Sequence, residues 1–205
     1  MIITFYNEKI DPEVVKYQKK VFDFFGYTIH QIKPDNWQGH GGSIDLFLSN
    51  HKKRWEYIVL FDIDCIPLNG TVINDSINWV KNNNGLYSVA QKANHIPNSI
   101  VYASPAFLAF SHKTYDLLGR PTFSCTDRSD CAGELTHKSI ELGYEVKLMY
   151  PSNVMIPKWD LTNDIKFGIG TTYENNIFHS FESRKNSNQI FLNKCKEILN
   201  GNKNI

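Results

Sequence analysis

The sequence predicts a single α/β domain: a mixed, mostly parallel sheet flanked by helices on both faces. Two observations predict this class. Short runs of β-branched and aromatic residues alternate along the chain with segments of helical periodicity. Helices between strands are the connections that parallel strands need, and they cover both faces of such a sheet. The length of 205 residues, of which 41% are hydrophobic, fits one core.

Six strands are expected where apolar and β-favouring residues run together. They occupy residues 2–6, 27–33, 57–67, 85–92, 99–111 and 144–152. Pro105 is expected to interrupt the fifth strand, because proline lacks the amide donor that a sheet ladder uses.

Most of the expected helices have a local start or stop signal. Asp11 caps the first helix, Pro12 takes its first helical position and Gly26 follows its end. Ser111 and Gly119 bound another helix in the same way. The remaining expected helices begin at Ser43, cover about residues 75–82 and 131–142, and close the chain at residues 188–199.

Composition excludes several classes of protein. Lysine plus arginine (22) balances aspartate plus glutamate (21), so the chain lacks the basic footprint of a dedicated nucleic-acid binder. The basic stretch HKKRW, residues 51–55, is interpreted as a solvated helix face. The N-terminal segment has no signal-peptide pattern, and no run of apolar residues is long enough to form a transmembrane segment.

The four cysteines form no CxxC pair and no zinc-binding spacing. They are Cys65, Cys125, Cys131 and Cys195. Without an export signal, they are expected to be reduced thiols in a cytoplasmic protein.

The segment YIVLFDIDCIP, residues 57–67, places Asp62 and Asp64 where an apolar strand leaves the sheet. Side chains two apart on an extended chain point to the same side, so both carboxylates face one point while Ile63 turns to the core. Their repulsion and desolvation cost on the order of several kcal/mol unless a partner compensates. A divalent cation that also binds phosphate oxygens is such a partner. The sequence therefore predicts a metal–diphosphate site here, with a pair of loop charges or helix caps as the alternative.

Several segments, taken in order, resemble the GT-A fold nucleotide-sugar glycosyltransferases. YIVLFDIDCIPLN resembles their D-x-D segment, and IITFYN resembles the first strand, whose end holds the nucleotide base. SPAFLAFSHKTYDLLGRP resembles the strand and helix that follow the D-x-D, where sugar and acceptor meet. DRSDCAGELTHKSIELGYEV resembles the acidic acceptor-side helix, and IFHSF the place of a third metal ligand. The resemblance covers roughly residues 1–182.

The resemblance implies a metal-dependent glycosyltransferase that uses a nucleoside-diphosphate sugar as donor. Asp64 would coordinate Mn²⁺ or Mg²⁺, while Asp62 would hold the ribose or complete the metal shell. His179 would be the third protein ligand, and its imidazole suits Mn²⁺ better than Mg²⁺. The alternative for His179 is an ordinary histidine at a strand end.

The resemblance also implies a nucleotide pocket lined by Thr4, Tyr6 and Asn7, with Tyr6 stacking on the base. The alternative for Tyr6 is a core aromatic residue. Residues of about 1–92 would form the nucleotide-binding half, and about 93–182 the acceptor half.

A carboxylate beside the acceptor hydroxyl can remove its proton and so invert the configuration of the transferred sugar. The candidates are Asp127, Asp130 and Glu134, and Asp130 is favoured because it opens the expected helix. The alternative is that they are acidic residues that stabilise the helix N-terminus. RSDCAGE departs from the Glu-Asp or Asp-type motif that inverting relatives commonly carry at this place.

Residues 157–180 have few periodic signals and are expected to form a long loop. Such a loop would act as a lid, with Gly168 and Gly170 giving it hinge freedom. Lys158 or Lys166 could reach the diphosphate, and Trp159 could stack on sugar or acceptor. The alternative is an ordinary surface excursion. NWQGHGG, residues 36–42, matches neither phosphate-loop pattern and is interpreted as a flexible connection to the next helix.

Two other functions fit the same elements. A nucleotidyltransferase that makes nucleotide sugars would have a glycine-rich basic loop after the first strand, where this chain has NEKIDPEVV. A non-catalytic sugar- or nucleotide-binding module would not need both Asp62 and Asp64. The acceptor is open: a glycan, a lipid-linked sugar, a protein or modified nucleic acid.

Overall fold

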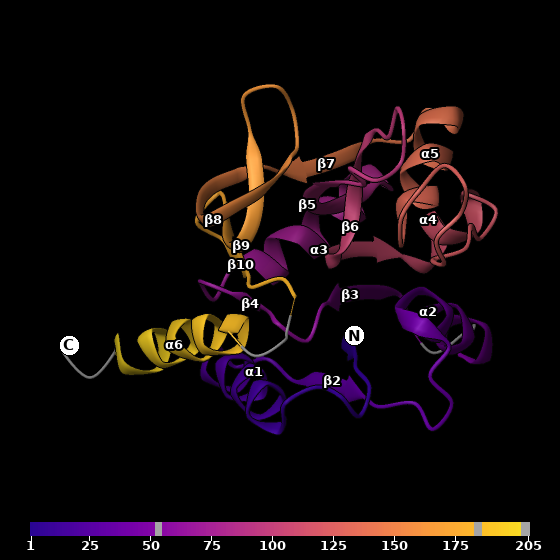
Figure 1. Cartoon of the computed structure of the whole chain (residues 1–205). Helices are drawn as coiled ribbons and strands as arrows, with labels where there is room; N and C mark the ends of the chain where they lie inside the picture. Colours follow the sequence, from indigo (N-terminus) through magenta and orange to yellow (C-terminus); the bar gives the residue numbers. More distant parts are fainter. Residues whose placement is uncertain (52–54, 183–185, 202–205) are drawn as a thin grey trace.

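The computed structural model describes residues 1–51, 55–182 and 186–201 of the chain. Figure 1 shows its elements. The basic residues 52–54 of HKKRW lie outside the described residues, and so does their predicted place on a solvated helix face. None of the helices in the described ranges combines the length and the apolar character that crossing a bilayer requires.

The main sheet has six strands in the order β2-β1-β3-β6-β5-β7. Pairing is parallel for β1–β2, β1–β3 and β5–β7, and antiparallel where β6 meets β3 and β5. The predicted mixed, mostly parallel sheet is therefore confirmed. The strands are β1 (Ile2–Phe5), β2 (Ile29–Ile32), β3 (Tyr57–Phe61), β5 (Leu86–Lys92), β6 (Val101–Ser111) and β7 (Val146–Met149).

Helices cover both faces of this sheet, and β3 shows why. Val59 and Phe61 point into one apolar cluster with α1, α3 and α6, while Ile58 and Leu60 point into another with α2, α4 and α5. A strand buried on both faces is therefore apolar at every position. The helices are α1 (Pro12–Phe24), α2 (Gly39–Asn50), α3 (Val72–Asn83), α4 (His112–Leu117), α5 (Gly133–Leu142) and α6 (Asn186–Gly201).

The expected caps of two helices are confirmed. The Asp11 carboxylate accepts a hydrogen bond from the Glu13 amide (2.9 Å) at the start of α1, and Gly26 follows its end with φ +77°. The Ser111 hydroxyl accepts from the Thr114 amide (2.9 Å) at the start of α4.

The predicted cap at Ser43 is wrong, because α2 begins earlier, at Gly39. Residues 39–42 are therefore helical rather than a flexible connection. A Cβ on Gly41 would lie 2.2 Å from the Phe123 carbonyl oxygen, so a glycine here allows α2 to approach residues 123–124 closely.

The predicted loop over residues 157–180 is also wrong. β8 (Pro151–Asp160), β9 (Lys166–Tyr173) and β10 (Ile177–His179) fill most of it. With β4 (Cys65–Pro67) they form a second, antiparallel sheet in the order β4-β10-β9-β8. The hairpin of β8 and β9 stands out from the main sheet in Figure 1.

The glycines of β9 explain this error. A Cβ on Gly168 would lie 2.2 Å from the Ile156 carbonyl oxygen of β8, and Gly170 has φ +71°. Both glycines mark places where the strand backbones approach or bend, and neither is a hinge in an open loop.

Three further boundaries differ from the prediction. The expected strand over residues 144–152 divides into β7 and the start of β8, and the expected strand over 57–67 divides into β3 and β4. β6 continues through Pro105 because the pairing register with β5 shifts between Ser88 and Val89. The Ser88 hydroxyl donates to the Ser104 and Phe107 carbonyls at this irregularity.

We expect Gly168→Ala to lower the free energy of unfolding by about 1–3 kcal/mol, because the added methyl group would push β9 away from the Ile156 carbonyl. Thermal unfolding followed by circular dichroism measures this. Gly201→Ala in α6 is the matched control, since a Cβ there meets no atom within 4 Å and alanine favours a helix. Equal melting temperatures for the two variants would contradict the close-approach explanation.

Candidate metal centre and its two cavities

The turn that carries Asp62 and Asp64 connects β3 of the main sheet to β4 of the second sheet. The Asp62 amide donates to the Ala106 carbonyl (3.0 Å), and the Cys65 amide donates to the Asp62 carbonyl (3.0 Å). Buried Gln18 of α1 donates its side-chain amide to the carbonyls of Asp62 (2.7 Å) and Cys65 (3.1 Å). The turn is thus held by hydrogen bonds from two sides, and Ile63 is buried as expected.

The register of the second sheet brings His179 to this turn. His179 pairs with Cys65 across β10 and β4, and the Ser180 amide donates to the Asp64 carbonyl (3.0 Å). The His179 Nε2 atom lies 3.4 Å from Asp62 Oδ2 and 3.2 Å from Asp64 Oδ1. The three predicted metal ligands therefore converge, with one candidate ligand atom from each lying within 4.8 Å of the others.

This group fits a divalent metal ion. Two carboxylates and one imidazole suit Mn²⁺ and similar ions. Within the described part of the chain, the buried Oδ1 atom of Asp62 makes no hydrogen bond, although His40 Nδ1 lies 3.4 Å from it. The side chains of His179 and Asp64 are 4% and 7% exposed, whereas that of Asp62 is 24% exposed. Asp62 therefore gives the group its access to solvent and ligand.

The two carboxylates change the acid–base behaviour of His179. Burial lowers the pKa of its imidazole, but the charges of Asp64 and Asp62 and the hydrogen bond to Asp64 outweigh burial, so the pKa is raised above 6.5. A proton and a metal ion therefore compete for the same nitrogen.

A cavity of about 180 Å³ opens on one side of the group. Tyr6 and Asn7, which follow β1, line it together with both aspartates. Thr4 is not among the lining residues; it is fully buried within β1.

The same cavity contains two residues that the sequence did not identify as functional, Trp37 and His40. Their rings stack, with 6.5 Å between centroids and an interplanar angle of 9°. His40 Nδ1 lies 3.4 Å from Asp62 Oδ1. In the sequence, the only sign that these two residues are functional is an aromatic residue and a histidine within NWQGHGG. That sign is weak until the structure places α2 beside Asp62.

A second cavity, of about 290 Å³, lies near His179, which is not among its lining residues. Gln91 and Phe181 line it, and both contact the His179 ring: Gln91 Nε2 is 3.5 Å from Nδ1, and the Phe181 ring stacks at 3.7 Å between centroids. Asp130 and Trp159 line the same cavity. The structure thus brings together the favoured base candidate and the expected stacking residue.

The other two base candidates have different surroundings. The Glu134 carboxylate accepts hydrogen bonds from Arg128 (2.7 Å), Thr126 (2.8 Å) and Ser129 (3.2 Å). Chiefly because of the Arg128 hydrogen bond, the pKa of Glu134 is lowered to about 2. Such an acid is a weak base and fixes the preceding loop. Asp127 is exposed in that loop.

Asp130 has a partly engaged carboxylate. Its Oδ1 atom accepts from the Cys131 amide (2.8 Å) and from the Cys125 thiol (3.1 Å). Asp130 precedes α5 rather than opening it, because the helix begins at Gly133.

Lys158 forms an ion pair with Glu182 (2.9 Å), and its ammonium lies 5.5 Å from the centroid of the Trp159 ring. Trp159 packs on Phe167 and Phe181 at 5.3 and 5.5 Å between centroids. Lys166 is paired with Asp160. Both lysines that were expected near the diphosphate are thus engaged with carboxylates.

Comparison with known proteins gives structural neighbours only. No family model matches the sequence, and a search of curated proteins found no match. A mannosyltransferase from Pyrobaculum calidifontis, solved with GDP-Man and Mn²⁺, covers 72% of this chain at 11% identity and a TM-score of 0.48. The match spans 54% of that protein, so this chain corresponds to about half of its length.

Two further neighbours have comparable scores. The catalytic domain of Drosophila β1,4-galactosyltransferase 7, solved with xylobiose, covers 93% of this chain and 78% of its own, at 13% identity and a TM-score of 0.48. A putative glucose-1-phosphate thymidylyltransferase from Bacillus anthracis covers 71% of this chain and 65% of its own, at 11% identity and a TM-score of 0.42. The neighbours therefore include GT-A fold glycosyltransferases, the family that the sequence resembles, and identify no subfamily.

We expect Mn²⁺ binding to weaken as the pH falls through the raised pKa of His179, because the imidazole must lose its proton to bind the ion. The loss should begin above pH 6.5 and reach about tenfold per pH unit below the pKa. Electron paramagnetic resonance of free Mn²⁺, between about pH 5.5 and 8.5, measures this. An affinity that stays constant over this range would exclude His179 as a ligand.

We expect Glu134→Gln to lower the melting temperature at neutral pH. A carboxylate whose pKa is lowered to about 2 stabilises the fold above its unfolded value of 4.5, and this contribution is lost as the pH falls towards 2. The melting temperatures of variant and wild type should therefore converge in acid. Glu141→Gln is the matched control, because Glu141 binds the same Arg128 but its side chain is 42% exposed. A smaller effect for Glu134→Gln than for the control would contradict this role.

Proposed function

We propose that this protein is a metal-dependent glycosyltransferase that moves a sugar from a nucleoside-diphosphate sugar to an acceptor hydroxyl. The observation that carries the proposal is the position of the Asp62, Asp64 and His179 group: both aspartates line one cavity, and His179 contacts Gln91 and Phe181, which line a second. A transfer reaction needs a donor and an acceptor to meet at one reactive centre, and this arrangement offers a separate space for each.

The cavity beside Tyr6 and Asn7 is assigned to the donor nucleotide. Its lining by the two aspartates would place the diphosphate at the group of metal ligands. Bound there, Mn²⁺ or Mg²⁺ would stabilise the negative charge that builds on the leaving diphosphate. Tyr6 and Trp37 supply aromatic surface for the base, and His40 faces the Asp62 carboxylate. Thr4 is left out of this assignment because it is buried in β1.

The cavity beside Asp130 and Trp159 is assigned to the acceptor. Asp130 is the proposed base that takes the proton of the acceptor hydroxyl, and Trp159 is the proposed stacking surface. Glu134 is assigned to the support of the loop, since its lone pairs are already used by three donors. For Asp127, the one observation that favours a contact with the acceptor is its exposed position. Lys158 would reach a phosphate only after leaving Glu182.

The nucleotidyltransferase alternative has one observation in its favour, the thymidylyltransferase among the neighbours. The segment between β1 and α1 weighs against it, because it holds no glycine and leads directly to the Asp11 cap. A non-catalytic binding module on this fold would bind the nucleotide and transfer nothing. The acceptor of the proposed reaction is a hydroxyl of a glycan, a lipid-linked sugar, a protein or modified nucleic acid.

The first test measures donor binding. Isothermal titration with a panel of nucleoside diphosphates and nucleotide sugars, with and without Mn²⁺, should reveal at least one metal-dependent ligand. Asp64→Asn should weaken that binding by about 100-fold or more, because an amide replaces a charged ligand. Asp160→Asn is the matched control, since Asp160 is exposed on β8 and outside both cavities. Nucleotide binding with the same affinity with and without Mn²⁺, and in wild type and Asp64→Asn, would refute the proposal.

The second test separates transfer from mere binding. Asp130→Asn should keep the affinity for the donor while lowering the rate of sugar transfer by about 100-fold or more. Release of nucleoside diphosphate in the presence of an acceptor panel, with products read by mass spectrometry, measures the rate. An unchanged rate would remove Asp130 as the base, and donor binding without any product would favour the binding module.

A further inference from the structure

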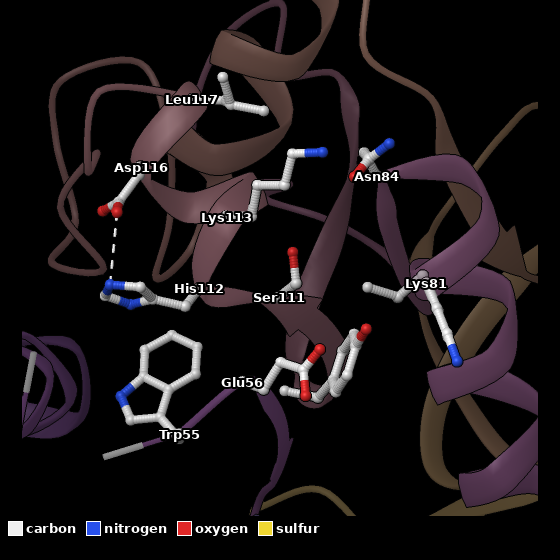
Figure 2. Close-up of a pocket in the computed structure, with 11 residues that line it drawn as sticks. Trp55, Glu56, Lys81, Asn84, Ser111, His112, Lys113, Asp116 and Leu117 are labelled. Carbon is white, nitrogen blue, oxygen red and sulfur yellow. Dashed lines mark ion pairs between the residues drawn. The ribbon is translucent and has the colours of Figure 1, made fainter. Parts of the chain in front are cut away.

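A third cavity, of about 720 Å³, lies at the opposite end of β3 from Asp62 (Figure 2). Trp55, Glu56 and Tyr57 line it at the start of β3, and Ser111 lines it at the end of β6, where it pairs with Tyr57. Tyr57 and Asp62 are five positions apart on an extended chain, which corresponds to about 16 Å. The cavity is therefore a site separate from the metal group.

The lining of this cavity holds two lysines, Lys81 and Lys113, and two carboxylates, Glu56 and Asp116. Lys81 and Lys113 are exposed, and within the described residues neither forms an ion pair. Asp116, by contrast, is paired with Arg120 (2.6 Å) and lies 3.3 Å from His112. Figure 2 shows Lys113 extending across the cavity towards Asn84. Both side chains line the cavity, and each has N–H groups that can donate a hydrogen bond to an anionic ligand.

The remaining lining residues suit a ligand that has hydroxyl groups as well. The exposed Glu56 carboxylate can only accept hydrogen bonds and repels a ligand with many negative charges. Tyr57, Val80 and Leu117 add aromatic and apolar surface. Trp55 is only 8% exposed and packs edge-to-face on Phe110 and His112, so it offers no open face as wide as a nucleobase.

We propose that this cavity binds an acidic sugar, meaning a sugar residue that carries a carboxylate or a phosphate. Lys81 and Lys113 would bind the acidic group, Glu56 and Asn84 would bind hydroxyls, and Tyr57 would pack on the ring. The volume falls within the range of pockets that hold small molecules, about 300–1,000 Å³. The binding site follows from its own geometry, whereas a role in holding a distant part of an acidic acceptor glycan rests on the proposed function.

The test uses titration calorimetry with probes of defined charge. Trigalacturonic acid carries carboxylates, glucose 6-phosphate carries a phosphate, and maltotriose is neutral. Wild-type protein should bind at least one acidic sugar at least about tenfold more tightly than maltotriose, and the tighter of the two identifies the acidic group. Equal binding of maltotriose, tighter binding of adenosine monophosphate or inorganic phosphate, or no binding of either acidic sugar would overturn the proposal.

Variants then locate the binding. The pair Lys81→Gln and Lys113→Gln, made together, should weaken binding of the acidic sugar by about tenfold or more, since both substituted side chains are exposed and the fold should tolerate the change. Asn84→Gly should also weaken it, and glycine accepts the φ of 51° at this position. Lys20→Gln on α1 is the matched control. Unchanged binding by the double variant would overturn the proposal.

Asp64→Asn separates this proposal from the proposed function. It should weaken donor binding by about 100-fold or more. Binding of the acidic sugar should stay unchanged, because Asp64 lies at the other end of β3. If wild-type protein binds the acidic sugar but no donor, the proposed function is refuted and the proposal for the third cavity stands. Loss of sugar binding in Asp64→Asn would mean that the sugar binds at the metal group, and the third cavity would have no role.

Discussion

Asp62 and Asp64 lie side by side at the junction of two sheets, and their repulsion is the constraint on which the site depends. The pairing of β10 with β4 answers it by placing the imidazole of His179 within 3.4 Å of both carboxylates. The same strand pairing attaches β10, and through it β9 and β8, to β4, the strand that follows β3 of the main sheet in the chain. A metal ion would take over the role of balancing the two charges.

Contacts with the residues around Asp62, Asp64 and His179 position the walls of both cavities. Phe181 stacks on His179 and packs on Trp159, so the β8–β9 hairpin is held beside the metal group by aromatic contacts. On the opposite side, the Asp45 carboxylate of α2 accepts from the amide and hydroxyl groups of residues 122–124. This network connects the helix that carries His40 to the loop that leads to Asp130. The walls of the two cavities are thus connected through segments that are distant in the sequence.

The third cavity extends the same organisation along β3. One end of this strand carries the acidic metal group, and the other end opens into a cavity lined by Lys81, Lys113 and the Glu56 carboxylate. The strand itself is apolar on both faces and buried, so it separates the two sites with a rigid spacer. Ligands at the two ends would bind independently unless one long molecule reached both.

The sequence by itself determined the elements whose formation depends on residues close together in the chain. The apolar run of β3 and the caps of α1 and α4 were predictable, because side-chain periodicity and capping depend on near neighbours. Asp62 and Asp64 also converge, but in a turn closed by the Cys65 amide and the Asp62 carbonyl rather than on the extended chain that was predicted. Only the tertiary structure decided the rest. Gly168 looked like a hinge because a close approach to β8 leaves no trace in one strand's own sequence. His40 had only a weak local signal, since its partner Asp62 comes from another segment. Glu134 and its partner Arg128 are near in sequence, but the loop geometry that pairs them is not encoded in periodicity. Pairing between distant segments, which sequence periodicity does not encode, made these residues part of the site or its support.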